Sequence, residues 1–385
     1  MQNFIEKIEE VKQHFVLKDF HLGFRRLIDC AFETQNMPVF EQCIQLNEWK
    51  ETAQPTAHEL GVKCIQFLDS LKQYKVEPKS TSSFLVKTND IEKIFSRGSF
   101  TLGRINIEIN NGDVWGLVGE NGNGKTTLLR ILAKDLAHEK GSIEYNNQLN
   151  NLSNYDIRTQ LTYIPQRTPK WFGGLKTNLK FTATHYGIVG KQNELWVMMM
   201  MIRFGLYQFR NHNWSELSSG YKMRFELART FLRKPKLLLL DEPLANLDVL
   251  SQQIVLEDLK YMAKSISQPL GIVLSSQQLF EVEKVSDKII FLKNGKPTLL
   301  HEQLQKEEIK KSNVIELEIE NNRDDLEKAL TSMLISNISF NGGQYIVEYE
   351  HTEGLKPLMQ LLLTHNIRIK YVRDISASSR RLFNA

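Results

Sequence analysis

Apolar side chains in the first eighty residues recur at the spacing of a helix face. In the segment FIEKIEEVKQHF they fall every three or four positions, which is typical of an amphipathic helix. The segments LKDFHLGFRRLIDCAF, MPVFEQCIQLNEW and ELGVKCIQFLDSLKQY repeat this spacing, and TQNMP and TAQPTA separate them. We therefore predict a helical N-terminal domain over residues 1–80. The pattern fits a bundle that only supports itself as well as a docking module, because helix packing alone names no ligand.

A different pattern begins after the polar joint KVEPKSTSS, where we place the domain boundary. Short β-rich runs such as INIEI, VWGLVG, LTYIP, KLLLLD and GIVLSS alternate with helical patterns. This alternation is typical of an α/β fold with a mixed, largely parallel sheet. We expect such a domain over residues 84–305.

The remaining segment, residues 312–385, changes pattern once more. Its runs VIELEIE, RDDLEKALTSML, NISF, QYIVEYE, LKPLMQLLLTH and IRIKYV read in the order β-α-β-β-α-β. This order predicts a ferredoxin-like α+β domain at the C-terminus. No catalytic constellation is present in this segment.

Composition narrows the class of protein. A chain of 385 residues is long for one core, so two or three domains are expected. Its 49 Lys and Arg against 45 Asp and Glu give a net charge of +4. That balance lacks the basic bias of nucleic-acid-binding proteins, and we expect no nucleic-acid partner. The three cysteines, Cys30, Cys43 and Cys64, match no zinc or CxxC spacing, so we expect buried reduced thiols, which suit the cytoplasm.

The apolar runs of the chain are short. VMMMMI and KLLLLD fall far below the length of about 18 residues that a membrane helix needs. The N-terminal stretch MQNFIEKIEEVKQHF has no apolar core of a signal peptide. If the protein acts at a membrane, a separate partner must supply the spans.

The stretch GENGNGKT, residues 119–126, matches the pattern G-x-x-x-x-G-K-[ST]. It follows the predicted strand VWGLV and opens the predicted helix TTLLRILAKDL, which is the context that this P-loop motif requires. Glycines let the backbone wrap a phosphate, and a helix N-terminus directs N–H dipoles at it. The motif predicts that Lys125 reaches the β- and γ-phosphates of ATP and that Thr126 ligates Mg²⁺. The predicted ATP-binding set here is Gly119, Glu120, Asn121, Gly122, Asn123, Gly124, Lys125, Thr126 and Thr127.

The run KLLLLDEP supplies two carboxylates. Four leucines predict a fully buried strand that ends in Asp241 and Glu242, and the carboxyl end of a parallel strand faces the ligand crevice. We expect Asp241 to hold the magnesium ion. Glu242 would orient or deprotonate the attacking water.

The segment ELSSGYKMRFELARTFLRKPKLLLLDEPLANLD, residues 216–248, resembles the signature, second Walker motif and D-loop of an ABC-type ATPase. LSSGYKMR is similar to the LSGGQ-like signature, with Ser219 where glycine is commoner. The resemblance covers roughly residues 84–300 and rests on five motifs in the family's order. It implies that the central domain is an ABC cassette of the α/β P-loop NTPase class.

The resemblance also implies roles for single residues. Ser218 and Gly220 would contact the γ-phosphate of ATP held by a second copy of the chain, and Asp248 would be the D-loop aspartate linking the two sites. Gln166 would be the Q-loop glutamine, and Phe95 is a candidate for stacking on adenine. The implied magnesium ligands are Thr126, Gln166 and Asp241.

The stretch VLSSQQLFE departs from the family pattern. The family's switch histidine would fall at Gln277, with Gln278 as the adjacent candidate. A glutamine amide can donate the same kind of hydrogen bond, but it carries no charge and shuttles no proton. We therefore expect a working ATPase, with Glu242 and Gln277 in the catalytic machinery and with slower turnover than a histidine version.

Function follows from the resemblance. The segment WFGGLKTNLKFTATHYG, residues 171–187, is similar to the helical subdomain entry of exporter-type subunits. The expected protein is the ATP-binding subunit of a membrane transporter, on the cytoplasmic face, working as a homodimer with an integral membrane permease. The alternatives are a soluble ABC protein that acts on ribosomes or nucleic acid, and a regulatory ATP sensor that does not hydrolyse ATP.

Overall fold

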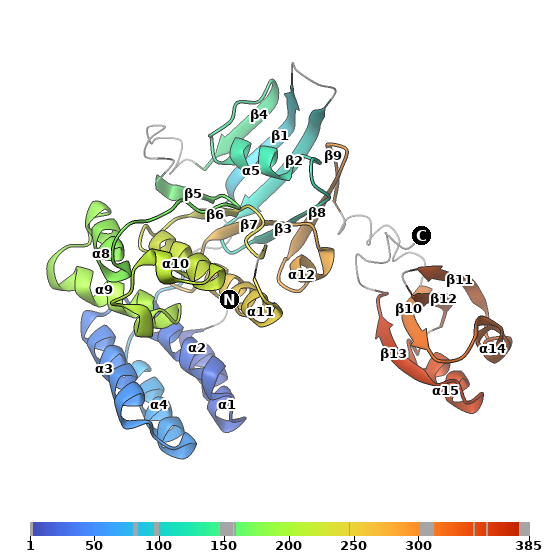
Figure 1. Cartoon of the computed structure of the whole chain (residues 1–385), viewed down its shortest axis with the longest axis horizontal. Helices are drawn as coiled ribbons and strands as arrows, with labels where there is room; N and C mark the ends of the chain where they lie inside the picture. The colour runs from blue at the N-terminus through green and yellow to red at the C-terminus, as the bar shows by residue number, and fades with distance from the viewer. Residues whose placement is uncertain are drawn as a thin grey trace.

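The computed structural model divides the chain into three parts (Figure 1). The predicted boundaries, between residues 80 and 84 and between residues 305 and 312, lie outside the described residues, and so does the end of the predicted C-terminal domain. The structure describes residues 3–79, 84–95, 100–146, 157, 159–245, 247–299, 312–341, 343–351 and 353–376.

The N-terminal part is helical, as the apolar spacing predicts. Its helices are α1 (Phe4–Val16), α2 (Phe20–Glu33), α3 (Met37–Ala53) and α4 (Ala57–Leu71). Asn3 and Thr56 each form a capping box at the start of a helix, which satisfies N–H groups that the helix leaves unpaired. All three cysteines of this part are free and buried, and burial raises the pKa of Cys30 and of Cys64 to about 12.

A six-stranded sheet forms the centre of the molecule. Its strands run in the order β5-β6-β7-β3-β8-β9. The first five are parallel, and β9 pairs with β8 in the antiparallel sense. Their bounds are β3 (Val114–Val118), β5 (Leu161–Ile164), β6 (Leu237–Leu240), β7 (Gly271–Ser276), β8 (Lys288–Lys293) and β9 (Lys296–Leu299).

A separate antiparallel sheet holds three further strands, which the sequence pattern had assigned to the largely parallel sheet. They are β1 (Phe84–Ile94), β2 (Thr101–Asn110) and β4 (Lys140–Tyr145), in the order β2-β1-β4. The short connection between β1 and β2 favours a hairpin, because parallel strands need a long crossover. Helix α5 (Lys125–Leu132) lies between the two sheets (Figure 1) and shares a core with both.

The parallel strands are buried on both faces. In β6, Leu237 and Leu239 face α5, whereas Leu238 and Leu240 face the opposite core, and all four are 0% exposed. The second face is covered by α10 (Ser219–Phe231), α11 (Val249–Ala263) and α12 (Leu279–Glu283). Strands that are covered on both sides read as continuous apolar runs.

Two helices, α8 (Leu175–His185) and α9 (Gly190–Arg203), form a lateral subdomain (Figure 1). The methionine run of α9 is buried from Met198 to Met201, so it is a core helix rather than an exposed partner surface. The same core includes the N-terminal helices and α10 and α11. The short 3-10 helices η1 (Tyr207–Phe209) and η2 (Trp214–Glu216) connect α9 to α10.

Charged side chains are buried where the N-terminal helices meet the cassette. The guanidinium group of Arg203, at the end of α9, pairs with Asp29 of α2 and with Asp258 of α11. Arg203 is 1% exposed. A second pair, Lys7 and Glu33, lies 2.7 Å apart, Nζ to Oε1. Since buried charges need partners, these contacts fix α1, α2, α9 and α11 to one another.

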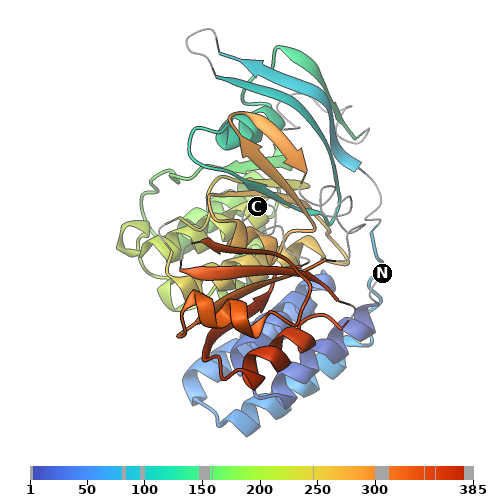
Figure 2. The same ribbon diagram turned by 90° about the vertical axis from the view of Figure 1, so that its right-hand side faces the viewer.

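The C-terminal part has the predicted β-α-β-β-α-β order. Its elements are β10 (Ser312–Ile319), α14 (Arg323–Ala329), β11 (Ile335–Asn341), β12 (Gln344–Glu350), α15 (Lys356–Thr364) and β13 (Ile369–Asp374). The antiparallel sheet has the order β11-β12-β10-β13, with the two helices side by side on it (Figure 2). This part builds a core of its own. Among the described helices, none is long and apolar enough to cross a membrane.

Candidate active site

Four neighbouring parallel strands deliver the candidate residues to one edge of the sheet. Strands β5, β6, β7 and β3 lie side by side in that order, and parallel strands present their carboxyl ends at the same edge. Ile164, Leu240 and Leu274 stand opposite one another near these ends. The predicted residues follow directly, so segments more than one hundred residues apart in the sequence meet here.

The P-loop after β3 has the backbone that its glycines predict. Gly122 and Gly124 adopt φ values of +82° and +99°, a region that favours glycine. A Cβ on Gly119 would lie 2.5 Å from the carbonyl oxygen of Leu292, so no larger residue fits there. Helix α5 starts directly after Gly124 without a side-chain cap, which leaves its first N–H groups for an anion. The cradle therefore suits a phosphate group.

Lys125 is buried at the first position of α5. Its ammonium donates to the carbonyl oxygens of Gly119, at 2.6 Å, and Glu120, at 3.1 Å. The same Nζ lies 3.2 Å from Oε1 of Glu242. The loop thus holds this cation beside the phosphate cradle and beside the carboxylate predicted to act on water.

The Asp241 carboxylate accepts hydrogen bonds from three hydroxyl groups. Its Oδ2 accepts from the Thr126 hydroxyl at 2.7 Å and from the Tyr163 hydroxyl at 3.1 Å, and its Oδ1 accepts from Ser275 at 2.9 Å. Burial, with the charge of Asp241, raises the pKa of Tyr163, so the phenol remains a donor at neutral pH. Hydroxyl and carboxylate oxygens suit Mg²⁺, which proteins hold through one or two carboxylates together with substrate phosphates.

Glu242 stands in an uncommon backbone conformation, with φ +46°. Its N–H donates to the Ser275 hydroxyl at 2.8 Å, which fixes this turn to the end of β7. Its carboxylate accepts from the amide of Gln166 at 2.9 Å and from the amide of Gln277 at 3.1 and 3.0 Å. The predicted switch position therefore lies in direct contact with the predicted catalytic carboxylate.

Other P-loop side chains point elsewhere. Glu120 and Asn121 are exposed, and Thr127 is half-buried. The Asn123 side chain is 8% exposed and accepts from the N–H of Asn294 in the turn between β8 and β9. In this structure Asn123 therefore attaches the loop to that turn by its side chain.

Ser218, Gly220 and Asp248 form a second group, which makes no hydrogen bond to the P-loop cluster within the described ranges. Ser218 is the N-cap of α10, and Asp248 is the N-cap of α11, where it accepts from the N–H and the hydroxyl of Ser251. A Cβ on Gly220 would lie 3.6 Å from that same hydroxyl. The signature and the predicted D-loop are thus neighbours.

The ring of Phe95 packs against the ring of Phe100, which in turn packs against the P-loop. Its ring centroid is 6.1 Å from that of Phe100. A Cβ on Gly124 would lie 3.0 Å from Cζ of Phe100. Phe100 therefore packs on the phosphate cradle, while Phe95 is half-buried one ring further out.

Sequence reasoning missed Ser275 and Tyr163. Ser275 joins Asp241 to the backbone of Glu242, and Tyr163 lies on β5 opposite Leu239 of β6. Both stand at carboxyl ends of strands, which was the available signal. Their side-chain directions depend on strand pairing that no local pattern specifies.

A P-loop and paired carboxylates at the edge of a parallel sheet define a nucleotide-binding fold of the P-loop class. A profile of the family described as ABC transporter matches residues 102–245. An uncharacterized ABC transporter ATP-binding protein of Methanocaldococcus jannaschii is 30% identical over 203 residues, which cover 50% of this chain and 77% of that protein. The chain belongs to the family of ABC transporter ATP-binding proteins, as its motifs predict.

Two further similarities limit what can be inferred about this chain from its family. A protein of Rickettsia felis, named as an export ATP-binding/permease protein, is 31% identical over 48% of this chain, but the chain spans only 34% of that relative. The structure of cbiO1 from Clostridium perfringens, part of the ABC transporter complex cbiONQ, has a TM-score of 0.51 at 23% identity and covers 60% of this chain and 96% of that one. This likeness confirms the cassette fold and carries no more.

Proposed function

We propose that this chain binds Mg·ATP at the carboxyl edge of the parallel sheet, hydrolyses the ATP, and thereby powers a membrane transporter. The observation that supports the proposal most strongly is the set of groups in contact with the Glu242 carboxylate. Its carboxylate lies 3.2 Å from the P-loop ammonium of Lys125 and accepts two amide hydrogen bonds. A carboxylate held beside a phosphate cradle is placed to accept a proton from water.

In the proposed reaction, Lys125 and the N–H groups of the P-loop bind the β- and γ-phosphates. Thr126 and Asp241, with Gln166, would hold Mg²⁺, which neutralises charge on phosphate oxygens when bound. Glu242 orients and deprotonates the attacking water. Gln277 positions that carboxylate through its amide, without the charge of a histidine.

The second group, Ser218, Gly220 and Asp248, is proposed to act across a dimer. The start of α10 offers N–H groups and a hydroxyl suited to a γ-phosphate, yet it stands apart from this chain's own P-loop cluster. A second copy facing head to tail would bring the group to its ATP. Phe95 is proposed to contact the adenine.

The proposed role in transport rests on the family to which the chain belongs. The chain would sit on the cytoplasmic face and bind an integral membrane permease. The name of the Rickettsia felis relative favours export, although a relative from Treponema denticola is named for phosphonates import.

Affinity isolation from native membranes tests the proposal. Tagged Glu242→Gln protein in Mg·ATP is expected to bring down untagged copies of itself and an integral membrane protein, because ATP remains bound without turnover. The double variant with Ser218→Arg, which fills the start of α10, should lose the untagged copies. Recovery of ribosomes, or of a tagged chain without untagged copies, would contradict the proposal.

A further inference from the structure

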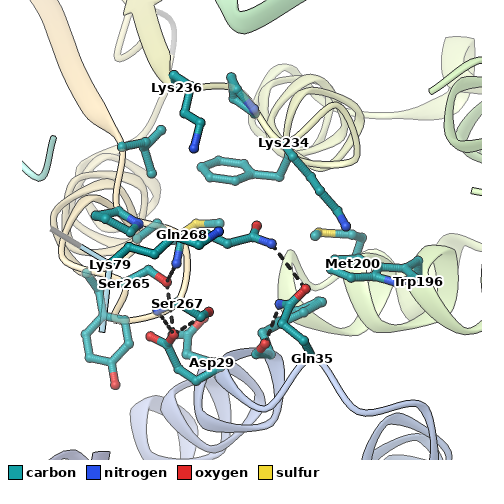
Figure 3. A pocket seen from close by; sticks show the side chains of 18 of the residues that line it. Asp29, Gln35, Lys79, Trp196, Met200, Lys234, Lys236, Ser265, Ser267 and Gln268 are labelled. Atoms are coloured by element: carbon teal, nitrogen blue, oxygen red, sulfur yellow. Dashed lines mark hydrogen bonds between the residues drawn. The ribbon is translucent and has the colours of Figure 1, made fainter. Parts of the chain in front are cut away.

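A cavity of about 310 Å³ lies between the N-terminal helices and the cassette (Figure 3). Its wall comes from the end of α2, from α9, from the segment that joins α10 to β6, and from the end of α11 with the following loop. None of the predicted ATP-site residues lines it. The volume is that of a site for a small organic molecule.

Three lysines line this cavity: Lys79, Lys234 and Lys236. Within the described residues, none of their ammonium groups forms an ion pair with a carboxylate. Partial burial lowers the pKa of Lys234 and of Lys236, and repulsion from Lys79 lowers both further. Lys79 therefore repels both of the other cations, and an anion bound among the three would relieve this repulsion.

The carboxylates in the wall are already neutralised. Among the described lining residues they are Asp29 and Glu33. Asp29 pairs with Arg26 and Arg203, and Glu33 pairs with Lys7. The cavity consequently offers an incoming ligand positive charge.

The rest of the wall combines apolar side chains with the ring of Trp196. Met200, Phe231 and Met262 supply apolar contacts. The indole N–H of Trp196 is buried and has no hydrogen-bond partner among the described residues. One face of this ring carries the ammonium of Lys234, 4.4 Å from the ring centroid.

The wall is held in place by its own hydrogen bonds. The Glu33 carboxylate accepts from the N–H groups of Ile266 and Ser267 at 2.9 and 2.8 Å. The N–H of Lys79 donates to the carbonyl oxygen of Ile266 at 3.0 Å. Gln268 donates to Gln35 at 3.1 Å (Figure 3). A site whose wall is already fixed loses little entropy on binding.

We propose that this cavity is a second ligand site, which binds a small phosphate ester with an apolar body. A phosphate monoester carries nearly two negative charges and three acceptor oxygens at neutral pH, which matches the three ammonium groups. The apolar body would lie against the methionines and Phe231. This site is distinct from the proposed ATP site and does not depend on it.

Calorimetric titration with phenyl phosphate tests the proposal. The titration uses the full chain carrying Lys125→Ala, so that the P-loop contributes little to binding. Replacing Lys234 and Lys236 by glutamine should weaken binding by about tenfold or more, because two charge-assisted hydrogen bonds are lost. Replacing both by arginine should retain most of the affinity. Lys356→Gln, an exposed lysine of α15 (66% side-chain exposure), is the matched control and should change nothing.

Three outcomes would overturn the proposal. One is equal affinity of phenyl phosphate for the Lys125→Ala protein and for the same protein with both glutamines, at unchanged thermal unfolding midpoints. Another is binding of inorganic phosphate as tight as that of phenyl phosphate, which would leave the apolar wall without a role. The third is binding of phenol as tight as that of phenyl phosphate, which would leave the lysines without a role.

Discussion

At the scale of single residues, Ser275 organises the two carboxylates. Its hydroxyl donates to Asp241 and accepts the N–H of Glu242. Glu242 needs that support, because a residue with a side chain at φ +46° costs on the order of 1–3 kcal/mol. The hydroxyl therefore stabilises the strained turn and fixes the direction of the Glu242 carboxylate.

We predict that Ser275→Ala lowers kcat for ATP hydrolysis about tenfold or more, because the Glu242 carboxylate loses its fixed position. ATP affinity should change less than about threefold, since the P-loop is untouched. Steady-state phosphate release and equilibrium ATP binding measure the two effects. Ser276→Ala is the control on the same strand, since that hydroxyl bonds Glu281 instead. An equal fall in ATP affinity and in kcat would contradict a positioning role.

Most of the candidate site could be predicted from the sequence, because its motifs are local. Lys125, Thr126, Asp241 and Glu242 meet as expected. The inward turn of Asn123 toward Asn294 could not be predicted, since the β8–β9 turn approaches the P-loop only after the sheet has formed.

At the scale of elements, a buried ionic cluster fixes α2, α9 and α11 together. Arg203 is its centre, with Asp29 and Asp258 as partners. Helical periodicity predicted α2, but it could not predict the cluster. An arginine at the end of an apolar run reads as a surface residue, and only the packing of the N-terminal helices buries it.

We predict that Arg203→Met lowers the free energy of unfolding by about 1–3 kcal/mol, since it removes the buried cation between Asp29 and Asp258 and leaves these carboxylates only Arg25 and Arg26 as partners. Urea unfolding followed by circular dichroism measures the change. Arg323→Met removes an exposed pair with Glu327 in α14 and should leave the unfolding curve nearly unchanged. Equal stability of the two variants would show that the buried cluster does not hold the helices together.

At the scale of the whole molecule, the two flanking parts relate differently to the cassette. The N-terminal helices share one hydrophobic core with α9, α10 and α11. The C-terminal part has a core of its own. Neither relation could be predicted from the sequence, because periodicity shows which side of a helix is apolar but not which element covers it.

Deletion of the C-terminal part should therefore be tolerated, whereas deletion of the N-terminal helices should not. Without residues 312–385 the remaining chain should stay monodisperse and bind ATP with unchanged affinity. Without residues 1–79 it should aggregate, since apolar surface of α9 and the carboxylate of Asp258 would be exposed. Size-exclusion chromatography and ATP titration measure both. A monodisperse, ATP-binding cassette without the N-terminal helices would contradict the shared core.

Phosphate release from the purified chain in Mg·ATP tests the central claim most directly. The account predicts turnover in the native protein, its loss in Glu242→Gln, and faster turnover in Gln277→His, where an imidazole can carry charge. Undiminished turnover in Glu242→Gln would show that Glu242 is not the catalytic carboxylate. Absence of turnover in both the native protein and Gln277→His, also on native membranes, would show that the chain binds ATP without hydrolysing it.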